Sequence, residues 1–283
     1  MGARRRRPST APGAHYLSDP KLAARLVEAG RVSPGDLVLD LGAGVGALTA
    51  PLVGVGARVV AIERDPRLVR RLRRRFEPAG VRVLEADLLE VPLPRRPYRV
   101  VASIPFAITT PLLGRLLDSP RGLLRRAVVV VEWGAGKRFS DPRPADARTL
   151  WWRARFDLRI ARRLEGHRFS PPAGVDAAVL VAERRRSPLV PRGHQAPFVG
   201  LVAQTLRDNS RPVRQALAPV FSKRQLHRLL GDLGVAPDAP VGLVSIEQWA
   251  AITAAMVALV EPARWPRRTP PWSPRHRSRK RRA

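Results

Sequence analysis

An apolar run that ends in an acid and three alternating glycines constrains this chain more than any other segment. Residues 38–41 read Val-Leu-Asp-Leu, and Gly42, Gly44 and Gly46 follow. Glycine tolerates positive φ and lets a ligand lie against the backbone, and the helix after such a turn begins with free N–H groups. The pattern predicts a strand-to-helix turn that binds a polar ligand, although an ordinary glycine-rich turn has the same pattern.

Three further apolar runs end in groups that can hydrogen-bond or stack on a ligand. Glu63 follows the first, Asp87 the second, and residues 103–106 the third. In an open parallel sheet, ligands bind outside the carboxyl ends of the strands, so we expect these groups to converge on one crevice. Glu63, one βα unit after the glycine turn, could accept hydrogen bonds from both hydroxyls of a ribose. Each carboxylate taken alone could equally cap a helix or face solvent.

The glycine spacing favours a cofactor without phosphates. It differs from the G-x-G-x-x-G turn that holds a pyrophosphate, and the sequence has no G-x-x-x-x-G-K-[ST] loop. S-adenosylmethionine has a ribose for Glu63, an adenine amine that could donate to Asp87, and an amino-acid end for the glycine turn. A nicotinamide-dependent dehydrogenase is an alternative, but it would give no reason for Phe106 beside Pro105 or for the basic ends of the chain.

The order of the motifs resembles that of the Erm-type rRNA adenine N6-methyltransferases. Besides the glycine turn, the chain carries His-Tyr-Leu-Ser-Asp-Pro at 15–20, Ile-Pro-Phe at 104–106 and Phe-Ser-Pro-Pro-Ala-Gly-Val-Asp at 169–176. The resemblance covers roughly residues 13 to 260. It implies an α/β fold with a Rossmann-like S-adenosylmethionine-dependent methyltransferase sheet and a small α-helical C-terminal domain. The implied activity is methyl transfer to N6 of one adenine in 23S rRNA, which would confer macrolide, lincosamide and streptogramin B resistance.

The resemblance also assigns roles to residues that would bind the cofactor. His15 and Leu17 would contact it largely through their backbone, and Gly42 and Gly44 would contact its methionine part. Glu63 and Asp87 keep the roles given above. Ser103 lies at a position that the family uses for both cofactor and substrate.

A second set of residues would position the target adenine. Phe106 would stack on the flipped base, and Phe169 would lie against its other face. The carbonyl of Ile104 would accept a hydrogen from N6, and Pro105 fixes its own φ and biases Ile104 away from helix, so that this carbonyl is presented rigidly. A side chain would supply the other acceptor, and Ser103 is the candidate.

Ser103 is also where the chain departs from the family pattern, which has asparagine before Ile-Pro-Phe. A serine hydroxyl is shorter and can donate or accept. It could accept from the amine directly or through water, reduce dimethylation to monomethylation, or slow the reaction. Two alternatives therefore stay open: a non-catalytic rRNA-binding or assembly protein, and a small-subunit rRNA adenine dimethyltransferase.

The charge balance indicates a polyanionic partner. The 52 Lys and Arg residues against 23 Asp and Glu give a net charge of +29, which favours phosphate binding through counterion release. The resemblance implies that this partner is 23S rRNA, free or in an assembling large subunit, and we expect a cytoplasmic monomer. No apolar run is long enough for a membrane helix, and the sequence has no Cys and no convincing metal-ligand cluster.

Composition shifts suggest four segments. Residues 1–12 and 264–283 are predicted to be basic, disordered arms. Residues 13–186 would form the methyltransferase domain and residues 187–263 a helical RNA-binding domain. A strand is predicted over 154–160 from its alternation, and helices are predicted at 198–206, at 224–233 and from Ser245 through Leu259, the last opened by a capping box with Gln248.

Overall fold

The computed structural model describes residues 16–17, 19–119, 122–142 and 146–266. His15, the predicted N-terminal arm and most of the predicted C-terminal tail lie outside these ranges. Within them, no helix is both long enough and apolar enough to cross a membrane.

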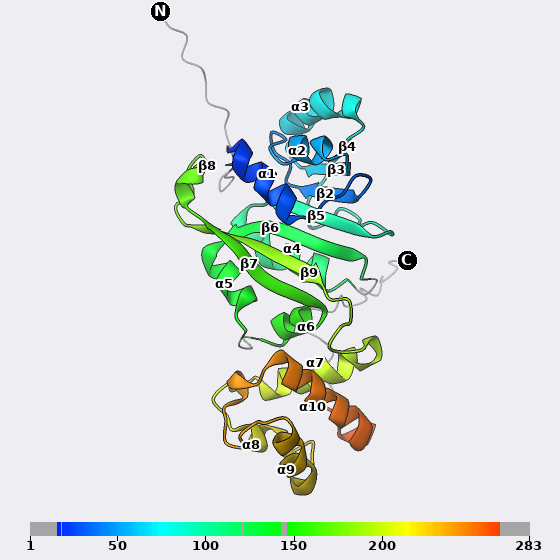
Figure 1. The fold of residues 1–283 in the computed structure, drawn as a ribbon, viewed down its shortest axis with the longest axis vertical. Coiled ribbons are helices and arrows are strands. Elements are labelled where there is room, and N and C mark those ends of the chain that lie inside the picture. The colour runs from blue at the N-terminus through cyan, green and yellow to red at the C-terminus, as the bar shows by residue number, and fades with distance from the viewer. Residues whose placement is uncertain (1–15, 18, 120–121, 143–145, 267–283) are drawn as a thin grey trace, which may run out of the picture. The chain divides into compact units, whose positions relative to one another are not determined.

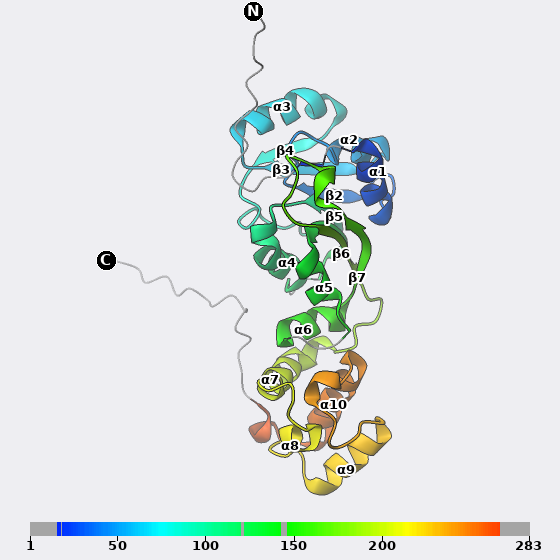
Figure 2. The same cartoon turned by 90° about the vertical axis from the view of Figure 1, so that its left-hand side faces the viewer.

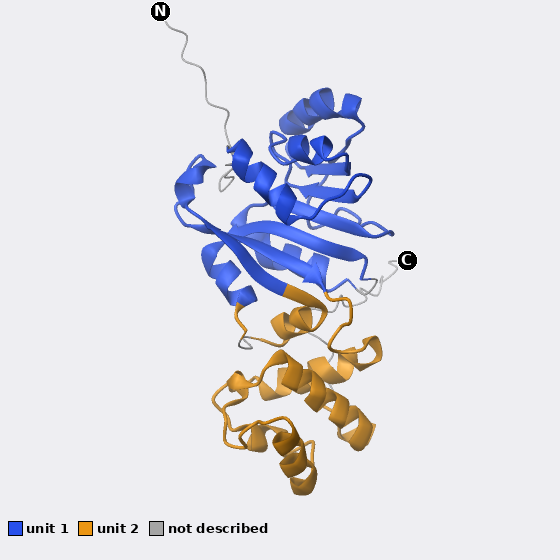
Figure 3. Ribbon diagram, viewed as in Figure 1, with its two compact units in different colours: residues 1–140, 158–184 blue, residues 141–157, 185–283 orange. Residues whose placement is uncertain are grey.

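The first of two compact units comprises residues 1–140 and 158–184, and the second comprises residues 141–157 and 185–283 (Figure 3). The second unit therefore begins close to the expected boundary at 186, but it also takes residues 141–157, which the sequence analysis placed in the methyltransferase domain. These residues form helix α6 (Ala147–Arg155), whose Trp151 and Trp152 are buried and which contacts helices α7 and α10 of the second unit. Burial of this aromatic pair groups α6 with the helices rather than with the sheet.

The first unit is built on a seven-stranded sheet with the order β4-β3-β2-β5-β6-β9-β7 (Figure 1). Strands β2 to β6 run parallel, whereas β9 runs antiparallel to β6, so the sheet is mixed near one edge, as predicted. The strands are β2 (Leu37–Leu41), β3 (Arg58–Glu63), β4 (Arg82–Glu85), β5 (Tyr98–Ser103), β6 (Leu124–Glu132), β7 (Phe156–Leu164) and β9 (Ala177–Arg184). The strand predicted over 154–160 begins two residues later than expected, because α6 continues through Arg155.

The strand order places a switch point between β2 and β5. From β2 the chain adds β3 and β4 on one side, and then returns to add β5 and β6 on the other. At such a point the loops after the two central strands diverge and leave a crevice for a ligand. The loops that diverge here are the glycine turn and residues 104–106.

Helices cover both faces of the sheet. On one face, α1 (Pro20–Ala29), α2 (Thr49–Gly54) and α3 (Pro66–Phe76) share a hydrophobic core with alternate strand residues such as Val128 and Val179. Helix α4 (Thr109–Leu117) contacts β6, and helix α5 (Trp133–Ser140) contacts both β6 and β9. A Cβ added to Gly136 of α5 would lie 2.5 Å from Ala178. Since Ala178 is the neighbour of Val179 along β9, its side chain points to the other face of the sheet, which α5 covers. A further two-stranded sheet pairs β1 (Tyr16–Leu17) antiparallel with β8 (Phe169–Ser170).

The second unit is helical. Besides α6 it contains α7 (Gln195–Thr205), α8 (Val213–Leu217), α9 (Lys223–Asp232) and α10 (Ile246–Leu259), and α7 and α10 lie side by side (Figure 2). Helices α7, α9 and α10 agree with the predicted helices. The capping box is present, with Gln248 N–H donating to the Ser245 hydroxyl and the Gln248 side chain accepting from Ser245 N–H, and Trp249 in the next turn is fully buried. Short 3-10 turns complete the two units: η1 (Glu77–Ala79), η2 (Phe106–Ile108), η3 (Gly166–Arg168), η4 (Arg192–His194), η5 (Val241–Leu243) and η6 (Pro262–Arg264).

Candidate active site

The glycine turn after β2 requires its glycines for different reasons. Gly42, Gly44 and Gly46 have φ values of +74°, +56° and +87°, in the left-handed region that L side chains rarely adopt. A Cβ on Gly42 would lie 3.3 Å from the carbonyl oxygen of Ser103, so this glycine lets the ends of β2 and β5 approach closely. A Cβ on Gly46 would lie 2.3 Å from the ring of Phe76, so this one lets the turn close on α3.

Glu63, at the end of β3, is hydrogen-bonded to the same turn. One carboxylate oxygen, Oε2, accepts from the backbone N–H of Gly44 over 2.9 Å. The other, Oε1, accepts from the N–H groups of Arg64 and Asp65 over 2.8 and 3.0 Å. The carboxylate is therefore held in one orientation, and Oε2 keeps a lone pair that can accept from a hydroxyl of a ribose.

Asp40 is the acid ahead of the glycines, to which the sequence analysis assigned no role. It is fully buried, its Oδ2 accepts from the Thr49 hydroxyl over 2.6 Å, and its Oδ1 has no hydrogen-bond partner within the described ranges. It lines a cavity of 20 Å³ with Leu17, Gly42 and Ser103, a space on the scale of one water molecule. Burial raises the pKa of Asp40 to about 7, against the opposing effect of the Thr49 hydrogen bond. The signal in the sequence was an acid inside an apolar strand directly ahead of the glycines.

Asp87 lies in the loop after β4 and is exposed. Its Oδ1 accepts from the N–H of Leu89 over 2.7 Å, and the Arg115 guanidinium of α4 donates to the carbonyls of Leu89 and Val91. Arg115 thus anchors the loop that carries Asp87. Since β4 pairs with β3, with Glu85 opposite Glu63, Asp87 lies one strand away from Glu63.

These groups fit S-adenosylmethionine. A buried carboxylate with an unpartnered oxygen favours a cationic donor such as the ammonium group at the amino-acid end of that cofactor, and Glu63 is oriented for its ribose. The structure brings Leu17, Gly42 and Ser103 to one cavity and joins Gly44 to Glu63. It places Asp87 in the loop after the neighbouring strand, β4. His15 lies outside the described residues, and its role stays a prediction.

Two phenylalanines lie beside this crevice. Phe106 opens η2, three residues after the end of β5, and is half-buried. Phe169 of β8 is 3% exposed and pairs with Leu17. Their ring centroids are 6.4 Å apart with an interplanar angle of 86°. Perpendicular rings do not form a parallel sandwich, so a base that stacks on Phe106 would meet the face of Phe169 only after one ring turns. The contact of Phe169 with the adenine therefore stays a prediction.

Asp176, the last residue of the Phe-Ser-Pro-Pro-Ala-Gly-Val-Asp motif, fixes the segment that carries Phe169. Its Oδ2 accepts from Nε and Nη2 of Arg163 over 2.9 and 2.6 Å, and its Oδ1 accepts from the N–H of Gly166 over 3.2 Å. The Arg163 hydrogen bond is the main reason that the pKa of Asp176 lies below its ordinary value. The motif thus supplies the Phe169 ring near the crevice and the Asp176 carboxylate, which holds the preceding loop in place.

Comparison with known proteins decides the family. The model of the family described as ribosomal RNA adenine dimethylase matches residues 7–257. The chain belongs to this family. It is accordingly an S-adenosylmethionine-dependent rRNA adenine N6-methyltransferase, and the fold class, enzyme class and cofactor predicted from the sequence are confirmed. No three His, Asp or Glu side chains among the described residues are grouped to hold a metal ion.

Individual proteins are also similar to this chain over most of its length. An rRNA adenine N-6-methyltransferase of Bacillus licheniformis is 34% identical over 90% of this chain and 89% of its own. The ribosomal RNA small subunit methyltransferase A of Thermosynechococcus vestitus is 32% identical, over 85% and 94%. The mycinamicin-resistance protein MyrB of Micromonospora griseorubida is 31% identical, over 85% and 76%. The crystal structure of the 23S rRNA methyltransferase ErmE superposes with a TM-score of 0.77 at 25% identity, covering 86% of this chain and 99% of that one.

Proposed function

We propose that the protein transfers methyl from S-adenosylmethionine to N6 of one adenine in 23S rRNA, and that the modified ribosome resists macrolides, lincosamides and streptogramin B. The observation that carries the reaction is the juxtaposition at the switch point. Gly42 of the cofactor turn lies against Ser103 of β5, and the half-buried Phe106 follows three residues later. The 23S target and the resistance are supported by the likeness to ErmE and to MyrB.

The residues of the chain would act by orientation. When bound, S-adenosylmethionine supplies an electrophilic methyl group. The N6 amine of adenine is a weak nucleophile because its lone pair is delocalised into the ring, so the site must hold the amine in line and draw its hydrogens out of the ring plane. The carbonyl of Ile104, held by Pro105, and the hydroxyl of Ser103 are the acceptors we assign to those hydrogens. Phe106 would hold the base by stacking.

Ser103 bears on how many methyl groups are added. An asparagine carbonyl extends further from the backbone than a serine hydroxyl and accepts without donating at the same atom. With the shorter Ser103 hydroxyl as acceptor, the one hydrogen that remains for the second methylation would be oriented less firmly than by an asparagine carbonyl. We therefore propose that this protein yields a larger share of monomethyladenine than a Ser103→Asn variant.

The remaining assignments rest on the same function. We propose that the second unit and the basic ends bind RNA, and that the protein acts as a monomer in the cytoplasm on 23S rRNA that is free or in an assembling large subunit. The net charge of +29 supports an RNA partner, but it does not indicate which RNA sequence is bound.

Mass spectrometry of modified adenines tests the proposal. Protein-free 23S and 16S rRNA would each be incubated with the protein and methyl-labelled S-adenosylmethionine, with Ser103→Asn in parallel. Methyl groups at a single 23S adenine are expected, with a shift toward dimethyladenine in the variant. Methylation of 16S rRNA instead would assign the protein to the small subunit. Tight binding of rRNA without methylation would favour a non-catalytic assembly role.

A further inference from the structure

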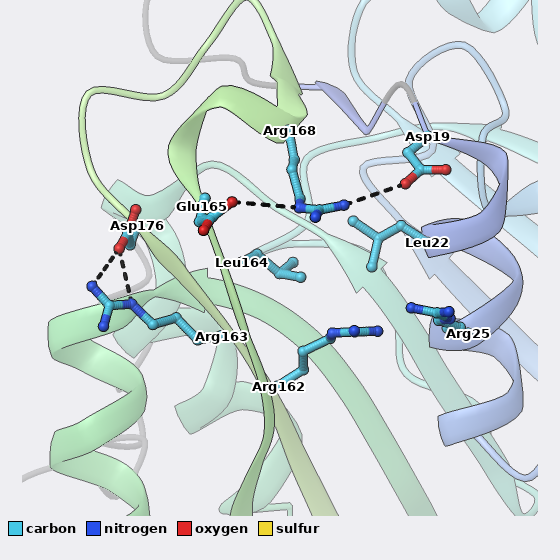
Figure 4. Close-up of a pocket in the computed structure, with 9 residues that line it drawn as sticks. All are labelled: Asp19, Leu22, Arg25, Arg162, Arg163, Leu164, Glu165, Arg168 and Asp176. Carbon is cyan, nitrogen blue, oxygen red and sulfur yellow. Dashed lines mark hydrogen bonds and ion pairs between the residues drawn. The ribbon is translucent and has the colours of Figure 1, made fainter.

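A groove on the first unit brings four arginines together (Figure 4), and the residues that line it do not include the glycine turn. It has a volume of 410 Å³ and lies between α1 on one side and the end of β7 with η3 on the other. Its lining residues are Asp19, Leu22, Arg25, Arg162, Arg163, Leu164, Glu165, Arg168 and Asp176. The groove is assembled from two segments that are far apart in the sequence.

Two of the four arginines are matched by carboxylates. Arg163 forms the two-pronged contact with Asp176 already described. Arg168 lies 3.7 Å from Asp19 and 4.0 Å from Glu165. These pairs account for the three acidic residues of the groove.

Arg25 and Arg162 are left without a matching acid. Both are exposed, neither has an ion pair with any residue that the structure describes, and their side chains extend into the same space (Figure 4). The buried side chains of Leu22 and Leu164 line the same groove. Two guanidinium groups that share a groove repel each other, and an anion between them removes that repulsion.

We propose that Arg25 and Arg162 bind a backbone phosphate of the RNA substrate. This inference rests on the proposed function, since it assigns a contact of the same substrate. The guanidinium fork matches the oxygens of a phosphodiester and can bind them in pairs, which an ammonium cannot do. The phosphate positions the strand and carries no sequence information.

The groove is tied to the candidate active site through its own ion pair. Asp19 follows Leu17 of β1 by two residues, and Arg168 directly precedes Phe169 of β8. The Asp19–Arg168 pair therefore joins the two segments whose strands meet at Leu17 and Phe169. A phosphate held at Arg25 and Arg162 is held by the elements that flank the adenine site, so it fixes the register of the RNA there.

The variant Arg25→Gln/Arg162→Gln tests this contact. Its matched control is Arg70→Gln/Arg74→Gln, which removes two exposed arginines from α3 of the same unit. We expect the groove variant to raise the KM for rRNA about tenfold, the loss of one charge-assisted contact, with little change in kcat or in the Kd for S-adenosylmethionine. The slope of log KM against log salt should fall by about one. Arg25→Lys/Arg162→Lys, which keeps the charge but not the fork, should recover only part of the affinity.

Four results would count against the contact or against its basis. An equal rise of KM in the α3 control would show a diffuse charge effect and overturn the groove. An unchanged KM and salt slope in the groove variant would overturn it as well. If the unsubstituted protein methylates no rRNA, the proposed function fails, and fluorescence anisotropy with the same RNA and variants still decides the groove. Competition by millimolar inorganic phosphate equal to that by RNA would assign the groove to free phosphate instead.

Discussion

The backbone N–H of Gly44 donates to Oε2 of Glu63 over 2.9 Å, which joins the glycine turn after β2 to the acid at the end of β3. Since Oε1 of the same carboxylate accepts from Arg64 and Asp65, Glu63 holds the ends of two strands together before any ligand binds. The residue assigned to the ribose is therefore also hydrogen-bonded to the turn that would bind the rest of the cofactor.

Glu63→Ala should weaken the cofactor site and the fold together. Loss of the carboxylate leaves the N–H of Gly44 in a nearly buried position without its acceptor, which costs about 1–3 kcal/mol in the free energy of unfolding. The Kd for S-adenosylmethionine should rise about tenfold or more, because the ribose also loses its acceptor. Chemical denaturation and isothermal titration calorimetry measure the two effects. Unchanged cofactor affinity in a folded variant would remove Glu63 from the site.

Phe106→Ala should reduce turnover without affecting the cofactor. Stacking of a base on an aromatic ring contributes about 1–3 kcal/mol, so kcat/KM for rRNA should fall about 5- to 150-fold. Phe106→Tyr keeps the ring face and should retain most of the activity. The Kd for S-adenosylmethionine, measured in parallel, should stay constant. A parallel loss of cofactor affinity would indicate that Phe106 supports the crevice instead of the base.

Gly46→Ala tests the glycine of the turn whose role is structural, because it packs against Phe76. Its Cβ would enter the Phe76 ring, and its φ of +87° strains any L residue, so we expect a loss of about 2–5 kcal/mol in the free energy of unfolding. Gly54→Ala on α2 is the matched control, since a Cβ there meets no atom within 4 Å. It should change stability by less than about 1 kcal/mol. Thermal unfolding of both variants would show the contrast, and equal melting temperatures would contradict it.

Local patterns were sufficient to predict the strand ends and the acids that follow them, because a strand buried on both faces reads as a continuous apolar run. They were not sufficient where distant segments decide the environment. The strand predicted from residue 154 overlapped the end of α6, whose tryptophans are buried by helices from the end of the chain. Burial of Phe169 depends on the pairing of β8 with β1, and the groove depends on Arg25 lying opposite Arg162.

Asp40 should make both stability and cofactor binding depend on pH near neutrality. Its pKa of about 7 lies above the ordinary value for aspartate of about 3.9, so the folded state binds more protons than the unfolded state between these values. The free energy of unfolding should therefore fall as the pH rises from about 4 to about 7, and then level off. A cationic cofactor favours the charged carboxylate, so its affinity should rise with pH over the upper part of this range.

Calorimetry of S-adenosylmethionine binding at pH 7, in buffers of different ionisation enthalpy, measures the proton that Asp40 would release. With half of the carboxyl groups protonated at this pH, we expect release of up to about half a proton per site. Asp40→Asn should abolish the release and flatten the dependence of stability on pH. Thr49→Val removes the hydrogen bond that lowers the pKa of Asp40, so it should move the midpoint of the pH dependence upward. Proton release that persists in Asp40→Asn would assign it to another group.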